Sequence, residues 1–472
     1  MVPNVTISII SASLCLCASQ AQVLVSDSLL ISYTAAELLA NGVAGAQFGV
    51  DVYRLRYQTP DANGNTSLAS AALVVPVTDS CNLALACYMH GTIVEKEAVP
   101  SRLSGEILVG YYLGGAGYVA VLPDYLGLGD SPGMHPYVHA ATEASASIDA
   151  MRATREFCDA NDRMLNGQVF LAGYSQGGHA CMATHWMIEA QFSDEFTVTA
   201  SAPCSGPHDI SGIQAEVITD TVPYPAPYYL PYVILAYEQL YPGLFTSYSE
   251  VFNAPYDTLL PPLYDGYHSS GEIDDVMPDV PSQVLRDSLL DVFANDPLHP
   301  FRIALQENDV YDWTPQAPVW MFYCEGDEHV FYQNSILAQQ TMTANGATDV
   351  LASSMGVTLD HGGCAFPALL AVKNWFHTMK APCTWNGVGE VPVIAVQIYP
   401  QPADQVLLVE LPQAQLGRAI WSLRSISGVE VAGGPVLSGP FQIDAGDLAS
   451  GSYVLHFSGE RDNHARLVVV AH

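Results

Sequence analysis

A serine stands where its hydroxyl could become a nucleophile, within Gly173-Tyr174-Ser175-Gln176-Gly177. The apolar run at residues 169–171 precedes it, and a helix-compatible segment follows it to about Glu189. A Gly-x-Ser-x-Gly turn between a strand and a helix holds its serine exposed on a sharp bend, where side chains on either side would collide with the backbone. The pattern predicts a nucleophile elbow with Ser175 as the attacking residue.

A serine hydroxyl needs a histidine base and a carboxylate that orients the base. In this arrangement the acid and the histidine follow the serine along the chain, on loops after later strands. Asp327 directly follows the apolar run at 318–323, and His361 lies further on, before a helical segment at about 369–376. We therefore predict a catalytic triad of Ser175, Asp327 and His361.

Neighbouring residues offer other assignments. His329 is too close to Asp327 to leave a separate acid on an earlier strand, and Asp360 adjoins His361, so that their side chains would diverge. Two carboxylates in the same loop stay open as substitutes for Asp327: Glu325 and Glu328. A purely structural role for these polar residues is the remaining alternative.

The oxyanion that forms during acyl transfer needs two backbone donors. One donor comes from the residue after the nucleophile, here Gln176, and the other from a loop after an earlier strand. His90-Gly91-Thr92 follows the apolar run at 83–89, so we predict the amides of Thr92 and Gln176 as the oxyanion hole. The Gly-punctuated turn at 124–131 is interpreted as structural, with Tyr125 lining the site.

The elements that would position these residues alternate along residues 22–200. Near-continuous apolar runs are typical of parallel strands covered on both faces, and they are found at 83–89, 118–123 and 169–171. Residues 196–200 and 318–323 are interpreted as later strands of the same sheet. Residues 142–157 predict a crossover helix with Thr142 as its N-cap. The pattern indicates an α/β fold.

Two segments depart from this alternation. Residues from about 204 to 315 are rich in Pro and Tyr and contain amphipathic pieces such as 284–293, which predicts an inserted helical cap over the site rather than a loop. An insertion without substrate contact is the alternative. From 391 to 472, short alternating strands such as 405–411 and 453–457 predict a small β-sandwich. The catalytic domain would then cover residues 22–385.

Composition limits the possible partners. The 472 residues carry 48 acidic and 15 basic side chains, a net charge of −33. Such a field repels nucleic acid and anionic lipid and favours a neutral or hydrophobic substrate, although adaptation to a saline habitat would give the same acidity. No segment after the amino terminus has the apolar length of a membrane span.

The amino terminus and the cysteines indicate export. Residues 1–21 are apolar, with small residues at Ser19 and Ala21, and predict a secretory signal peptide. Its removal leaves eight cysteines, an even number that suggests disulfides but leaves their pairing open. Cys181, on the helix after the elbow, is best interpreted as a buried thiol. No cysteine spacing resembles a metal site.

Several motifs together resemble the secretory lipase and esterase branch of the α/β-hydrolase superfamily. They are His90-Gly91-Thr92, Asp124-Tyr125-Leu126-Gly127-Leu128-Gly129-Asp130-Ser131, His135-Pro136-Tyr137 and Gly173-Tyr174-Ser175-Gln176-Gly177-Gly178-His179. The likeness covers roughly residues 30–380. It implies the triad of Ser175, Asp327 and His361 and hydrolysis of carboxylic esters, with no metal or organic cofactor.

The tail resembles the type IX secretion sorting domain of Bacteroidetes. The likeness rests on Ile398-Tyr399-Pro400-Gln401-Pro402-Ala403, Leu448-Ala449-Ser450-Gly451-Ser452-Tyr453-Val454-Leu455 and Arg466-Leu467-Val468-Val469-Val470, with Gln401 where Asn is usual. It implies the type IX secretion machinery as a partner and a protein that is secreted or attached to the cell surface. A carbohydrate-binding β-sandwich is the competing interpretation, which no cluster of tryptophans supports.

These observations predict a secreted serine esterase or lipase that works through an acyl-enzyme. A serine peptidase of the same fold, of the dipeptidyl or prolyl type, is the nearest alternative. A surface binding protein without turnover is a second one. Turnover of simple esters would exclude the binding protein, and a comparison of ester with aminoacyl-amide substrates would separate the two enzymes.

Overall fold

The computed structural model describes residues 22–78, 81–385, 397–410, 420–425, 429–435, 440–458 and 463–472. The chain divides into two compact units, Met1–Trp385 and Asn386–His472. Residues 1–21, which we expect to be a signal peptide, lie outside the described residues.

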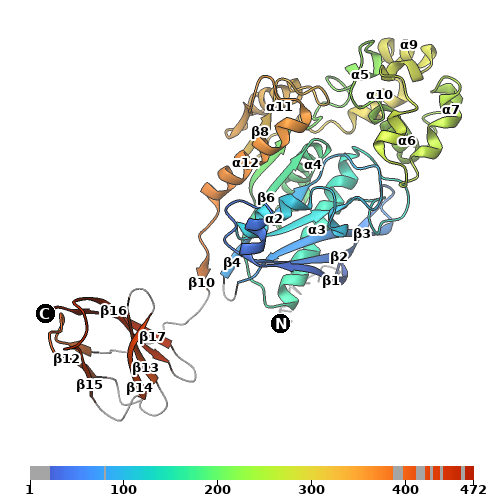
Figure 1. Ribbon diagram of the computed structural model, residues 1–472. Coiled ribbons are helices and arrows are strands. Elements are labelled where there is room, and N and C mark those ends of the chain that lie inside the picture. The colour runs from blue at the N-terminus through green and yellow to red at the C-terminus, as the bar shows by residue number, and fades with distance from the viewer. Residues whose placement is uncertain are drawn as a thin grey trace, which may run out of the picture. The chain divides into compact units, whose positions relative to one another are not determined.

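The larger unit contains a ten-stranded sheet in the order β1-β2-β3-β5-β4-β6-β7-β8-β9, with β10 paired to β4 (Figure 1). The strands are β1 Leu24–Tyr33, β2 Val50–Pro60, β3 Thr66–Pro76, β4 Cys81–Met89, β5 Tyr118–Pro123, β6 Leu165–Tyr174, β7 Val198–Cys204, β8 Val319–Tyr323, β9 Val350–Ser354 and β10 Thr384–Trp385. From β5 through β4 to β9 neighbouring strands are parallel, as predicted. The pairs β1–β2, β2–β3 and β3–β5 are antiparallel, so the sheet is mixed.

Helices cover both faces of this sheet. The long helices α3 (Ala140–Ala160) and α4 (Gln176–Gln191) share an apolar core with one face, and α2 (Ile107–Gly115) and α12 (His361–Met379) share one with the other. The remaining elements around the sheet are α1 Ala35–Ala40, α11 Gln333–Ala344 and the 3-10 helix η1 Pro100–Arg102. The predicted N-cap at Thr142 is wrong, because α3 begins two residues earlier, after His139.

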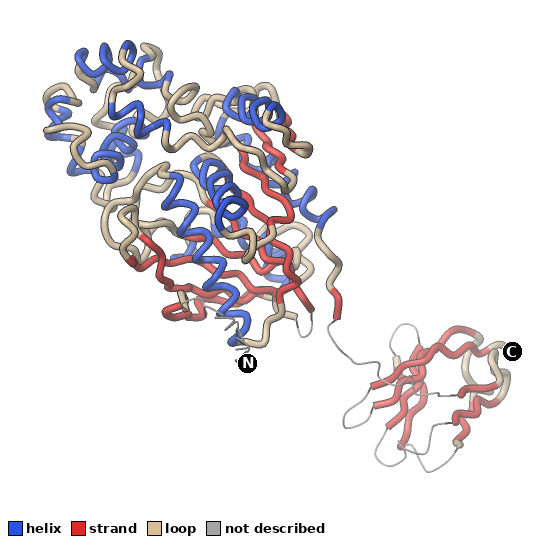
Figure 2. Tube along the Cα trace, turned by 180° about the vertical axis from the view of Figure 1, so that it is seen from behind, coloured by secondary structure: helices blue, strands red, loops and turns tan. Residues whose placement is uncertain are grey.

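The segment between β7 and β8 is helical, as predicted for the cap, and gathers at one end of the larger unit (Figure 2). Its elements are α5 Glu216–Thr219, α6 Tyr229–Leu240, η2 Tyr248–Glu250, α7 Tyr256–Leu259, η3 Pro261–Leu263, α8 Ser270–Asp274, η4 Pro281–Val284, α9 Asp287–Asn295 and α10 Pro300–Gln306. Side chains such as Ile234, Phe252 and Phe301 are fully buried in an apolar cluster. The cluster also includes Tyr137 and Val138 from the segment before α3. The cap is therefore a packed substructure.

The smaller unit consists of two antiparallel sheets, β11-β12-β15 and β14-β13-β16-β17. The strands are β11 Gln397–Tyr399, β12 Val406–Glu410, β13 Ile420–Ser425, β14 Glu430–Pro435, β15 Phe441–Asp444, β16 Gly451–Ser458 and β17 Asn463–Val470. Leu407 of the first sheet and Leu455 of the second belong to one buried cluster. This arrangement is consistent with the predicted β-sandwich.

Two disulfides join cysteines of the larger unit, Cys81 with Cys383 and Cys324 with Cys364. The four free cysteines of the described residues are buried: Cys87, Cys158, Cys181 and Cys204. The interpretation of Cys181 as a buried thiol is confirmed. Among the described helices, none combines the length and the apolar character needed to span a bilayer.

Candidate functional site

Ser175 lies alone between the end of β6 and the start of α4, with φ 60° and ψ −125°. Backbone of this kind is rare for a residue with a side chain and persists only where its surroundings impose it. A Cβ added to Gly173 would lie 1.9 Å from the Gly177 carbonyl oxygen, and one added to Gly177 would lie 1.9 Å from that of Met89. Both flanking positions therefore require glycine, and the predicted strand–turn–helix is present.

The structure brings Asp327 and His361 together at the carboxyl edge of the sheet. Asp327 is buried in the loop after β8, and His361 is the first residue of α12. The Nδ1 atom of His361 lies 2.8 Å from Oδ2 and 2.9 Å from Oδ1 of the carboxylate. Oδ1 also accepts the backbone N–H groups of His329 and Val330, at 3.1 and 2.8 Å. The carboxylate is thus held by the imidazole and by two backbone donors, and His361 Nε2 makes no hydrogen bond with a described residue.

The neighbouring residues have other contacts. Asp360 caps α12 by accepting the Gly363 N–H at 2.7 Å. His329 stacks on the ring of His361, with centroids 4.8 Å apart and planes 8° from parallel. Burial, and then the charge of His361, lower the pKa of His329. A neutral ring therefore lies against the imidazole of His361 and restricts how it can turn.

The Cys324–Cys364 disulfide joins the two segments that carry this pair. Cys324 lies three residues before Asp327, and Cys364 three residues after His361. The covalent bond therefore connects the acid loop to the first turn of α12.

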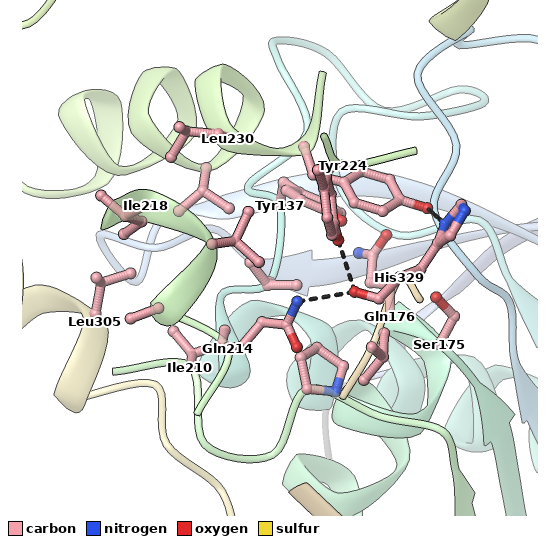
Figure 3. A pocket seen from close by; sticks show the side chains of 17 residues that line it. Tyr137, Ser175, Gln176, Ile210, Gln214, Ile218, Tyr224, Leu230, Leu305 and His329 are labelled. Atoms are coloured by element: carbon pink, nitrogen blue, oxygen red, sulfur yellow. Dashed lines mark hydrogen bonds between the residues drawn. The ribbon is translucent and has the colours of Figure 1, made fainter. Parts of the chain in front are cut away.

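A pocket lined mainly by apolar side chains lies beside Ser175 (Figure 3). Ser175 and His329 lie at one end of it, and the other end is formed by Ile218, Leu230 and Leu305 of the cap. Ser175 Oγ makes no hydrogen bond with a described residue, so the serine is not joined directly to His361. Catalytic hydrogen bonds often tighten only when substrate binds, and the stacked His329 places His361 next to this pocket.

The loop predicted to supply an oxyanion donor runs past the serine. A Cβ added to Gly91 would lie 3.6 Å from the Cβ of Ser175. Thr92 follows, and its hydroxyl lies 2.9 Å from the hydroxyl of Tyr137. Gln176 opens α4, where the first N–H groups have no partner within the helix. Within the described residues, the amides of Thr92 and Gln176 donate to no other group, so both remain free for a ligand.

A buried polar network holds the side chain of Gln176. Its Nε2 donates to Glu143 Oε1 at 2.8 Å and to His135 Nε2 at 2.7 Å. His135 accepts this bond because its Nδ1–H donates to the Leu126 carbonyl at 2.8 Å, and burial lowers its pKa to about 4. Glu143 also accepts from His179 at 2.7 Å; burial opposes a charge on His179, but this carboxylate raises its pKa overall. This network therefore fixes the Gln176 side chain at the first turn of α4.

Residues 103–361 match the family described as secretory lipase. The chain belongs to the secretory lipase family. The matched stretch contains Ser175, Asp327 and His361.

Solved structures agree with this membership. A mutant of the rice cell wall degrading esterase LipA from Xanthomonas oryzae is 30% identical, with a TM-score of 0.67 over 76% of this chain and 97% of that chain. A hydrolase from Legionella pneumophila is 28% identical, with a TM-score of 0.70 over 76% and 98%. Candida antarctica lipase A, 15% identical with a TM-score of 0.57 over 76% and 83%, shares the fold. No curated protein sequence matches.

The family and the esterase structures establish the enzyme class of this secretory lipase. It has an α/β-hydrolase-like fold and is a carboxylic ester hydrolase.

The site also contains residues that the sequence analysis does not identify. Glu143 and His179 are buried polar side chains on helices, and their only signal is a charged or ionisable residue on an otherwise apolar helix face. The expectation that Tyr125 lines the site is wrong. Its ring is buried, and its hydroxyl donates to the His90 carbonyl at 3.2 Å. Tyr125 therefore supports the loop that begins at His90.

Proposed function

We propose that this secretory lipase hydrolyses esters through an acyl-enzyme on Ser175. His361 removes the hydroxyl proton as Ser175 attacks the ester carbonyl, and Asp327 holds the imidazole in the required tautomer. The amides of Thr92 and Gln176 stabilise the tetrahedral oxyanion. The observation that carries the proposal is the 2.8 Å contact of Asp327 with His361, at the same sheet edge as a serine on a nucleophile elbow.

The proton taken from Ser175 is then passed to the leaving alcohol. His361 returns it to the alcohol oxygen, which leaves, and the acyl group remains on Ser175. A water molecule attacks this ester with His361 again as base, and the serine hydroxyl is regenerated as the carboxylic acid departs. The apolar end of the pocket supports an acyl group with a hydrocarbon chain, because burial of such a chain is favourable there.

Ester hydrolysis by protein lacking residues 1–21 tests this proposal. The substrates are p-nitrophenyl esters from acetyl to palmitoyl, and the variant is Ser175→Ala. Ser193→Ala, which changes an exposed serine after α4, is the matched control. We expect Ser175→Ala to abolish turnover and the control to retain it. Turnover that survives Ser175→Ala, or a folded protein that hydrolyses none of the esters, would contradict the proposal.

We also propose that the protein is exported, with residues 1–21 as signal peptide and 391–472 as a β-sandwich sorting domain for the type IX secretion machinery. Two disulfides in the larger unit and two antiparallel sheets with one shared core support this assignment. The test is fractionation of a Bacteroidetes host that expresses the full chain or a chain ending at 385. Export should require the tail, and equal export of both chains would contradict the proposal.

A further inference from the structure

The peptide group between Gly91 and Thr92 carries one of the two proposed oxyanion donors, and one hydrogen bond holds it while a second holds the peptide before it. The Gly91 carbonyl oxygen lies 2.7 Å from His90 Nδ1, which donates because a carbonyl can only accept. A trans peptide is planar, with its N–H opposite its C=O, so this bond also sets the direction of the Thr92 N–H. The preceding amide, Gly91 N–H, donates to Glu106 Oε1 at 3.0 Å.

Glu106 is itself fixed to the core of the sheet. It is the residue before α2, where the positive end of the helix dipole favours a carboxylate. Its second oxygen accepts the hydroxyl of Tyr88, a fully buried residue near the end of β4. Burial, and then the Glu106 charge, raise the pKa of Tyr88 well above its usual range, so the phenol keeps its proton and donates.

This carboxylate and the nucleophile both lie close to Gly91. A Cβ added to Gly91 would lie 2.9 Å from Glu106 Oε1 and 3.6 Å from the Cβ of Ser175. A side chain at residue 91 would therefore displace the Glu106 carboxylate from its present place. A displacement of Glu106 would move the loop relative to Ser175.

We infer that Glu106 is a positioning residue, which holds the Gly91–Thr92 peptide so that the Thr92 N–H points at the oxyanion. This inference rests on the proposed function, because it concerns the donor that acts in that reaction. Glu106 does not touch the ester; it acts through Gly91. A glutamine has the same length: its oxygen can accept the Gly91 N–H, and its Nε2 can donate to the Tyr88 hydroxyl oxygen once that O–H turns away. A shorter carboxylate should not reach both groups.

The experiment compares Glu106→Gln, Glu106→Asp, Glu106→Ala and Tyr88→Phe in protein lacking residues 1–21. The readouts are kcat and KM on p-nitrophenyl butyrate and the affinity for a trifluoromethyl ketone, whose adduct with Ser175 carries an oxyanion. Loss of a whole oxyanion donor costs about 10²–10³ in kcat. For a displaced donor we expect the Ala and Asp variants to lose roughly 10- to 100-fold in kcat and in ketone affinity, with KM changed less than about twofold.

Glu106→Gln should stay within about threefold of the wild type, and Tyr88→Phe, which keeps the carboxylate but removes its anchor, should fall between Gln and Ala. The matched control is Glu97→Gln, since Glu97 is an exposed carboxylate of the same segment that pairs with Arg102 at 2.6 Å instead of with the loop. It should leave all three readouts unchanged.

The outcomes separate this inference from the proposed function. If the Ser175→Ala variant still hydrolyses the ester, the proposed function itself is overturned. An inactive Ser175→Ala beside a fully active Glu106→Ala would overturn only the positioning role. If Glu106→Asp retains activity and Glu106→Gln loses it, the charge and not the reach of the side chain matters, and the inference fails. A fall in thermal stability with unchanged kcat would also show a purely structural contact.

Discussion

Removal of the Cys324–Cys364 disulfide should reduce activity more than its effect on stability predicts. The two cysteines are 40 residues apart in sequence. In the chain-entropy treatment a loop of that size contributes roughly 3.9 kcal/mol to the free energy of unfolding. The Cys81–Cys383 disulfide has a separation of 302, and the same treatment gives roughly 5.7 kcal/mol. By entropy alone, loss of the second disulfide should destabilise the enzyme more.

For activity we expect the opposite order: loss of the Cys324–Cys364 disulfide should lower kcat more than loss of the Cys81–Cys383 disulfide. The Cys324–Cys364 bond connects the segments that hold the Asp327 carboxylate 2.8 Å from His361 Nδ1. Without it, the start of α12 can move relative to the acid loop, and small displacements of reacting groups cost large factors in rate. We expect Cys324→Ser/Cys364→Ser to lower kcat roughly tenfold or more. The other disulfide joins Cys81 at the start of β4 to Cys383, the residue before β10, away from the proposed triad.

The assay pairs two measurements on both double variants. The midpoint of thermal unfolding reports stability, and kcat on a p-nitrophenyl ester at 25 °C, well below both midpoints, reports the site. If Cys324→Ser/Cys364→Ser keeps the wild-type kcat, or if both double variants lose the same fraction of it, the Cys324–Cys364 bond does not position the Asp327–His361 pair. A larger fall in the unfolding midpoint for the Cys324 pair would refute the entropy estimate separately.

Four further outcomes follow from the structure. Gly177→Ala should prevent folding or activity, because its Cβ would lie 1.9 Å from a backbone oxygen; soluble yield and kcat check this. Burial lowers the pKa of His135 to about 4, so it binds fewer protons in the folded protein than in the unfolded chain, and stability falls as the pH drops from about 6.5 to about 4; His135→Gln should flatten that slope in unfolding midpoints. Burial raises the pKa of Asp309 to about 6, so stability falls as the pH rises from about 4 to about 6, and Asp309→Asn should reduce that loss. Leu305→Trp, at the far end of the pocket, should lower turnover of palmitoyl esters relative to acetyl esters.

The sequence predicts the parallel strands β4 to β8, which are largely buried. It does not predict β9, which also pairs in parallel, because most positions of β9 are exposed or half-buried. The strand at Tyr118–Pro123 is predicted without error. The antiparallel strands β1 and β2 are not anticipated, because neither has a near-continuous apolar run. No position of β1 is buried, and β2 interleaves buried with mostly half-buried positions. The cap is predicted as helical, but its many short helices are not delimited, since their ends depend on packing within the apolar cluster.

The site is predictable where chemistry is local or ordered along the chain. The elbow is a pattern of five residues, and the positions of Asp327 and His361 follow from strand order. The contacts of Glu106 with Gly91, and of Glu143 with Gln176, join residues 15 and 33 apart in sequence, which only the tertiary structure brings together. The pairing of the cysteines is likewise set by tertiary structure, since eight cysteines allow 105 complete pairings and only four of them are joined.

Two carboxylates near the nucleophile have different electrostatic tasks in this proposal. Asp327 lies against an imidazole that becomes positively charged during the reaction, so its own charge is useful there. Glu106 lies on the side where negative charge develops, and a second negative charge would oppose the oxyanion. Its two oxygens are occupied by the Gly91 N–H and the Tyr88 hydroxyl, which offset that charge through hydrogen bonds. Geometry, not charge, is then what Glu106 contributes, which is why an amide of equal length should replace it and a shorter acid should not.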